Sequence, residues 1–109
     1  MKKPKLLIAF IALFVSLTMN AQTQLEKKAH KAADEMTKVL SLNEQDSNSV
    51  YEIQLNRFKE NQSIKKEFSD QPDIKKEKLN NLGKTVYNQL KKALGKERLA
   101  KWRNYKSNK

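Results

Sequence analysis

The sequence predicts an all-α fold in which an elongated helical hairpin is flanked by shorter helices. The 109 residues include only two Gly and two Pro, and Lys, Glu, Leu, Asn and Gln are abundant, which favours helix over sheet. Apolar residues recur at intervals of three and four. The stretch Leu42–Phe68 contains neither Gly nor Pro, and as one helix it would span about 39 Å. We therefore expect four mature helices that follow an N-terminal signal helix.

Residues 1–21 have the pattern of a secretory signal peptide. Three lysines among the first five residues precede an apolar run from residue 6 to 17, and the segment ends in small and polar residues at Ala21. An uncleaved membrane anchor is the rival interpretation, but the apolar run is shorter than the roughly 20 residues needed to cross a bilayer. We expect cleavage after Ala21 and export to a bacterial periplasm. Residues 22–109 then form a single all-helical domain.

The first mature helix is predicted over Thr23–Leu40, where apolar side chains recur every three or four residues. Its apolar face is narrow and rich in Ala, which suits close packing against another helix. The next helix has two possible N-terminal caps. Asn43 can cap it with acidic residues in the first turn, or Ser49 can form a capping box with Glu52. The choice changes where this helix begins and not whether it forms.

The long second helix carries two apolar stripes, whereas most helices of its size carry one. At about 100° per residue, the first stripe contains Val50, Ile53, Ile64 and Phe68. The second lies roughly a third of a turn round and contains Tyr51, Leu55 and Phe58. One stripe can face the core of the chain, and the other is then available to a second subunit or a partner. Because Arg57 interrupts the first stripe, which of the two faces inward stays open.

A third helix is predicted from Pro72 to about Leu94, and Asp70 is the expected cap. A four-residue connection between two long helices makes them antiparallel neighbours. The apolar stripe of the third helix is interrupted by Gly83, which we expect to allow a close backbone approach or slight bending. Gly95 should end this helix. The last segment, Lys96 to about Lys106, is a short basic amphipathic helix with Leu99, Trp102 and Tyr105 at three-residue spacing.

The positive charge of the mature chain is concentrated at its C-terminal end. Residues 22–83 hold eleven basic and eleven acidic side chains, whereas residues 84–109 hold nine basic side chains and one acid, Glu97. Such an end attracts acidic proteins, phospholipid headgroups or nucleic acid over long range. Export argues against nucleic acid and leaves weak contact with a membrane surface as a further possibility. The alternative interpretation is a solvated basic face that keeps the protein soluble.

Several kinds of chemistry are excluded or poorly supported by the residues present. The chain has no Cys, which excludes disulfides, thiolate metal sites and Cys catalysis. His30 is the only imidazole, and with Asp34 it offers two metal ligands and no third nearby. A surface histidine beside a carboxylate is the favoured interpretation. The chain also lacks a Gly-rich phosphate loop and a base that is clearly placed beside a nucleophile. We predict no enzymatic activity, no cofactor and no metal.

Two segments of related form, Leu42–Asp46 and Leu94–Arg98, each place a Leu ahead of a helix break and a charged first turn after it. With the signal peptide and the order of four helices, this layout resembles the Spy and CpxP family of periplasmic proteins, whose pattern is two copies of Leu-Thr-x-x-Gln. The places of Thr are taken by Asn43 and Gly95, and the places of Gln by Asp46 and Arg98. The resemblance covers essentially all of the mature chain in layout and is loose in motif.

The resemblance implies a thin, cradle-shaped, all-helical antiparallel homodimer without a cofactor. Members of that family hold unfolded envelope proteins without ATP on a basic and apolar surface, or inhibit an envelope stress sensor. The resemblance therefore predicts an ATP-independent chaperone of holdase type. The alternative is a regulator or adaptor that docks one acidic envelope partner, such as a stress-sensor domain.

Candidate protein-binding residues come from two parts of the chain. Tyr51, Leu55 and Phe58 form the expected client surface, because large apolar groups at helical spacing adapt to many partners. Alternatively, these three residues complete the core or form a dimer interface. The basic end contributes Lys91, Lys92, Arg98, Lys101, Trp102 and Arg103. At helical spacing, Leu99 and Trp102 are also suited to fastening the last helix to the hairpin.

Overall fold

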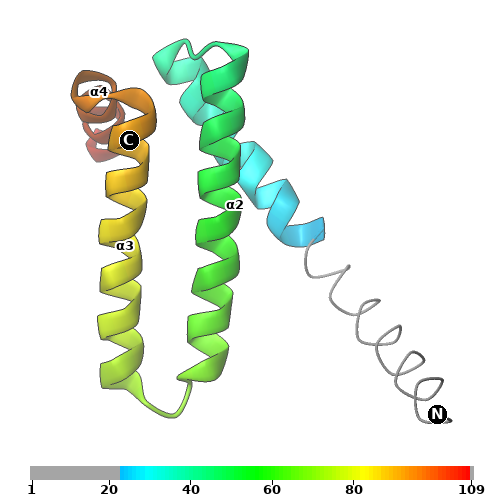
Figure 1. Ribbon diagram of the computed structural model, residues 1–109, viewed down its shortest axis with the longest axis vertical. Coiled ribbons are helices and arrows are strands. Elements are labelled where there is room, and N and C mark those ends of the chain that lie inside the picture. Colours follow the sequence, from blue (N-terminus) through cyan, green and yellow to red (C-terminus); the bar gives the residue numbers. More distant parts are fainter. Residues whose placement is uncertain (1–22, 109) are drawn as a thin grey trace, which may run out of the picture.

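The computed structural model describes residues 23–108, and this part of the chain is all-α with four helices (Figure 1). The first helix covers residues 23–40 of the described chain. It is followed by α2 (Glu44–Glu67), α3 (Pro72–Leu94) and α4 (Lys96–Ser107). The predicted all-α class and the four helices are confirmed. The predicted signal peptide lies outside the described residues.

Helix α2 begins at the first of its two candidate caps. Asn43 has an extended backbone, and its side-chain oxygen accepts a hydrogen bond from the Asp46 backbone N–H at 2.8 Å. Glu44 and Asp46 occupy the first turn, where their negative charges favour the positive end of the helix dipole. The Ser49 start is therefore wrong, because the cap at Asn43 satisfies a free amide a turn and a half earlier.

Replacing Asn43 with alanine is expected to lower the free energy of unfolding by about 1 kcal/mol, because a cap side chain is lost. Urea denaturation followed by circular dichroism measures this change. Asn48→Ala is the matched control, since Asn48 is exposed inside the same helix. The control should leave stability unchanged or raise it slightly, because alanine is the better helix former. Equal losses in both variants would contradict the assigned cap.

Helices α2 and α3 form the predicted antiparallel hairpin, joined by residues 68–71 (Figure 1). Pro72 is the first residue of α3, where its missing N–H costs nothing. The predicted cap at Asp70 is wrong. Because Pro72 takes the first helical position, the cap falls on Gln71, which makes no side-chain capping bond. The first bond of this helix joins the Lys75 N–H to the Gln71 carbonyl at 2.9 Å.

Gly95 forms the joint between α3 and α4. Its φ of 89° and ψ of 161° lie in a region that side chains other than Gly avoid. The Gly95 N–H donates to the Lys91 carbonyl at 2.8 Å, and the Gly95 carbonyl accepts from the Leu99 N–H at 3.2 Å. One residue thus ends one helix and starts the next, as predicted for the end of α3. The close backbone approach considered for Gly83 is wrong, because a Cβ added there would meet nothing within 4 Å.

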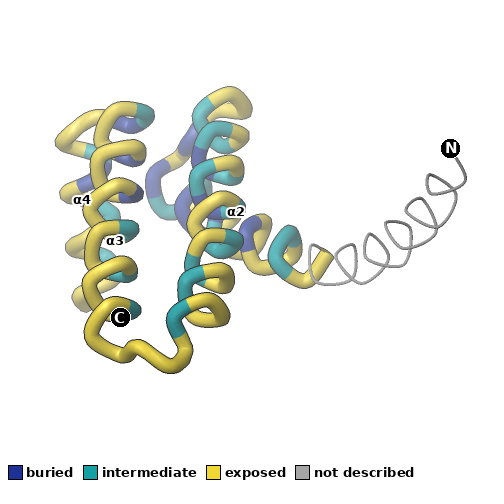
Figure 2. Tube along the Cα trace, turned by 60° about the horizontal axis from the view of Figure 1, so that its bottom comes forward, coloured by how far each residue is buried: buried dark blue, intermediate teal, exposed yellow. Residues whose placement is uncertain are grey.

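The core lies at one end of the hairpin, where all four helices meet. Its buried side chains are Ala33, Met36, Leu40, Leu42, Val50, Val86, Leu90, Leu94 and Leu99. Met36 of the first helix and Val50 of α2 are fully buried. From residue 55 to 85, by contrast, no residue is buried, and Figure 2 shows this far half of the hairpin as intermediate and exposed. The hairpin therefore extends well beyond the core that holds it.

Candidate functional site

The second stripe of α2 faces the first helix. The Tyr51 ring stacks on the His30 ring with centroids 4.2 Å apart and an interplanar angle of 25°. Tyr51, Leu55 and Phe58 are all half-buried, and of the three Tyr51 packs against the core. The first stripe provides Val50 and Ile53 to the core, while its far members Ile64 and Phe68 stay half-buried.

Phe58 of α2 lies beside the first helix and lines two hollows together with residues of that helix. A hollow opens on either side of its ring, and Lys28 borders both. Ala32 and Lys38 line one hollow, and Leu25 and Lys65 line the other. We call this region, with Phe58 between the two hollows, the wedge. Apolar side chains here are flanked by lysines whose stems add further apolar surface.

The Tyr51 hydroxyl is un-ionised at physiological pH. Partial burial raises the pKa of the Tyr51 hydroxyl, and the nearby carboxylates of Glu26 and Glu52 raise it further. Because the shift is upward from 10.0, the ring stays neutral at physiological pH. His30, whose ring packs on Tyr51, belongs to no metal site in residues 23–108, where no group of three or more His, Asp or Glu is placed to hold an ion.

Gln54 is a buried polar residue that sequence reasoning missed. It is 3 % exposed, and it lies on α2 between the two stripes. Its Nε2 donates to the Met36 sulfur at 3.6 Å, and its Oε1 accepts from Arg57 Nη1 at 3.1 Å. The Arg57 guanidinium also lies 5.5 Å from the centre of the Phe58 ring. These contacts link the core to the wedge. The only sequence signal for Gln54 was its position between two apolar stripes.

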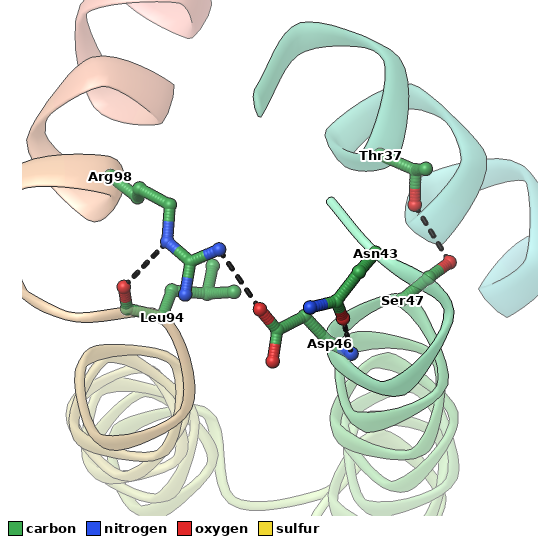
Figure 3. A network of polar contacts seen from close by, with 6 residues as sticks. All are labelled: Thr37, Asn43, Asp46, Ser47, Leu94 and Arg98. Atoms are coloured by element: carbon green, nitrogen blue, oxygen red, sulfur yellow. Dashed lines mark hydrogen bonds and ion pairs between the residues drawn. The ribbon is translucent and has the colours of Figure 1, made fainter. Parts of the chain in front are cut away.

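The two related segments lie side by side, although about fifty residues separate them in the chain (Figure 3). Leu42 and Leu94 both belong to the core. Arg98 Nη1 donates to Asp46 Oδ2 at 2.9 Å, and Arg98 Nε donates to the Leu94 carbonyl at 2.7 Å. The fifth positions of the two segments therefore bind one another, and the ion pair fixes the start of α4 to the start of α2. Opposite charges at matching positions were the signal for this pair.

A double-mutant cycle with Asp46→Ala and Arg98→Ala measures the strength of this ion pair. The side chains are 23 % and 39 % exposed, so solvent screens them, and we expect a coupling energy of about 0.5–1 kcal/mol. Arg98→Ala alone should cost more than Asp46→Ala, because it also removes the bond to the Leu94 carbonyl. The coupling should shrink in high salt. A coupling that is unchanged by salt would contradict an ionic origin.

The six predicted residues of the basic end divide into two groups. Arg98 and Trp102 are used within the chain. Trp102 packs against the core and stacks on Tyr105 with ring centroids 5.5 Å apart. The other four, Lys91, Lys92, Lys101 and Arg103, are exposed and form no ion pair with residues 23–108.

The first helix is also fastened to α4. Lys106 Nζ lies 3.5 Å from Glu35 Oε1, and the Tyr105 hydroxyl donates to Glu35 Oε2 at 3.4 Å. The first helix therefore binds α2 through the Tyr51 ring and α4 through Glu35. The hollows of the wedge are lined by residues of the first helix and α2, and Glu35 both lines one of them and binds α4.

Comparisons of the chain with protein-family models, with curated proteins and with solved structures find no match.

Proposed function

We propose that this chain is an exported protein that holds unfolded envelope proteins without ATP. The observation that carries the proposal is the incomplete burial of Leu55 and Phe58, two large apolar side chains at the wedge of a small, otherwise very polar protein. Apolar surface of this kind is attractive to any chain that exposes its own apolar residues. The signal-peptide pattern of residues 1–21 supports export.

A client would be held by the burial of apolar surface, which requires no hydrogen bonds of fixed direction. A client residue that enters a hollow beside Phe58 would cover apolar surface on both partners, which stabilises the complex by about 25 cal/mol per Å². Lys28 and Lys65 border the same hollow and would favour clients with acidic side chains near their apolar ones. Binding and release of this kind are equilibrium processes, so no nucleotide is needed.

A second copy of the chain is part of the proposal. The far half of the hairpin carries half-buried apolar residues on both helices, with Ile64 and Phe68 on α2 and Leu79 on α3. Pairing of two chains would cover part of this surface. The similarity of Leu42–Asp46 and Leu94–Arg98 to the paired motifs of the Spy and CpxP family supports the same arrangement. The molar mass of residues 22–109 in solution tests it, and a monomer at all concentrations would contradict it.

Suppression of aggregation tests the holding function. Stoichiometric amounts of residues 22–109 should slow the aggregation of a denatured client at low ionic strength without ATP. The double variant Leu55→Asp/Phe58→Asp should lose most of this effect, because two charges then occupy the wedge. Asn56→Asp/Ser63→Asp is the matched control, since it adds the same charge at exposed positions of α2 away from both stripes.

The stability of both double variants is measured by urea denaturation, so that loss of protection can be separated from loss of fold. Equal protection by the two double variants would overturn the role of the wedge. No protection by the parent protein would overturn the holding function itself.

The second candidate is a regulator that docks one acidic envelope partner. The four exposed basic side chains Lys91, Lys92, Lys101 and Arg103 favour it, because no carboxylate in residues 23–108 neutralises them. Capture from an envelope extract separates the two candidates. One stoichiometric, salt-sensitive partner supports the regulator, whereas many weakly bound proteins support the holdase.

A further inference from the structure

One exposed side of α3 combines positive charge with an aromatic ring. Lys84, Tyr87 and Lys91 recur at spacings of three and four, so they lie on one face of the helix. From α4, the Arg103 guanidinium lies over the Tyr87 ring at 5.3 Å from its centre. We call these four residues the basic face. Tyr87 is 38 % exposed, and with Ile74 it is one of two large apolar side chains that residues 23–108 leave exposed.

The charge of the basic face is not balanced from within the described chain. Neither Lys84, Lys91 nor Arg103 forms an ion pair there, whereas the neighbouring cations Arg98 and Lys106 are bound to Asp46 and Glu35. The nearest acidic residue on the same side of α3 is Glu77, about 10 Å before Lys84 along the helix axis. Solubility requires no such separation of charge, so the basic face is adapted to an anionic partner.

The shape of this region favours a broad partner over a peptide. The basic side chains come from two helices, and the hollow beside Lys84 and Tyr87 is bordered by polar or small residues of α3 alone, namely Asn80, Gly83 and Asn88. It contains no apolar groove in which the side chains of an acidic peptide would be fixed. Tyrosine beside Lys and Arg is the combination found at the boundary between lipid headgroups and water. No helix of residues 23–108 is long and apolar enough to span a bilayer.

We propose that the basic face docks this protein on a surface of anionic lipid headgroups. Lys84 and Lys91 act as point charges on lipid phosphates, and Arg103 offers a planar set of N–H donors that matches two phosphate oxygens. The Tyr87 ring holds the guanidinium in place and lies at the level of the headgroups.

This inference goes beyond the proposed holding function and does not depend on it. The wedge is lined by residues of the first helix and α2, whereas the basic face is formed by residues of α3 and α4, so the two surfaces share no residue. Lipid binding can fail while holding succeeds, and holding can fail while lipid binding succeeds.

Sedimentation with lipid vesicles tests the inference. Residues 22–109, which contain the whole described core, are mixed with vesicles of phosphatidylcholine and phosphatidylglycerol or of phosphatidylcholine alone. We expect binding to the anionic vesicles at low salt, release at high salt and no binding to the neutral vesicles. Each basic side chain near an anionic surface strengthens binding about fivefold. The triple variant Lys84→Gln/Lys91→Gln/Arg103→Gln should therefore bind on the order of 100-fold more weakly.

The control variant Lys27→Gln/Lys66→Gln/Lys75→Gln removes the same net charge from lysines away from the basic face, and Lys75 lies on the opposite side of α3 from Lys84. At about 0.1 M salt it should stay within about threefold of the parent, because screening then limits the reach of each charge to about 10 Å. Circular dichroism checks that both triple variants remain helical. Equal losses in the two variants would show that net charge alone binds lipid and would overturn the inference. So would equal binding to neutral vesicles, or no binding to anionic vesicles at low salt.

Discussion

Met36→Ala is expected to lower the free energy of unfolding by about 3 kcal/mol, because a fully buried side chain is replaced by a cavity. Met36 is the largest fully buried side chain of residues 23–108 and lies in the core that the four helices share. The substitution also removes the sulfur that accepts the hydrogen bond from Gln54 Nε2. A domain of this size has only about 5–10 kcal/mol of total stability, so this one substitution removes roughly a third to three-fifths of it.

Urea denaturation of residues 22–109, followed by circular dichroism, measures this loss. Ile74→Ala is the control, because Ile74 is also a large apolar residue in a helix but is 39 % exposed. The control should change stability by less than about 0.5 kcal/mol. Similar losses in Met36→Ala and Ile74→Ala would mean that the first helix does not share one cooperative core with the hairpin.

The two glycines of the chain should respond to alanine in opposite directions. Gly95→Ala is expected to cost about 2 kcal/mol, because the positive φ at this position is strained for any residue with a Cβ. Gly83→Ala should raise stability by about 0.5–1 kcal/mol, because Gly83 lies inside α3 with no nearby group to obstruct a methyl. Crowding plays no part at either site, since neither added Cβ meets an atom within 4 Å.

Thermal unfolding of the two glycine variants checks this prediction, and Trp102 provides a local measurement. If alanine relieves its strain by joining α3 and α4 into one continuous helix, Trp102 leaves the core and its fluorescence shifts to longer wavelength. Trp102 is the only tryptophan of the chain, so the signal is unambiguous. A stabilised Gly95→Ala variant with unchanged fluorescence would contradict the role of Gly95 as the joint.

The helices could be predicted from the sequence because their signals are local. The Asn43 cap, the first position of Pro72 and the stop at Gly95 each act within one turn, so residue type and spacing reveal them. The error at Asp70 was of the same local kind. Pro72 takes the first helical position, so the cap is the residue before it, which is Gln71 and not Asp70.

The contacts between helices could not be predicted in the same way. The stacking of Tyr51 on His30 and the ion pair of Asp46 with Arg98 depend on the angles at which helices cross. Those angles are set by packing of the whole core and have no local signature. The wedge is a product of the same angles. The stripe Tyr51, Leu55 and Phe58 was therefore recognised as a unit, while its position against the first helix was not.

The position of the core at one end of the hairpin has a consequence for motion. Because residues 55–85 contain no buried side chain, the far turns of α2 and α3 should open locally without unfolding the rest of the protein. Their amide hydrogens should exchange with solvent faster than those near Val50 and Leu90, which are buried in the core. The core end of the protein would then stay rigid while the far turns of the hairpin fluctuate, and these flexible turns could adapt their shape to a bound partner.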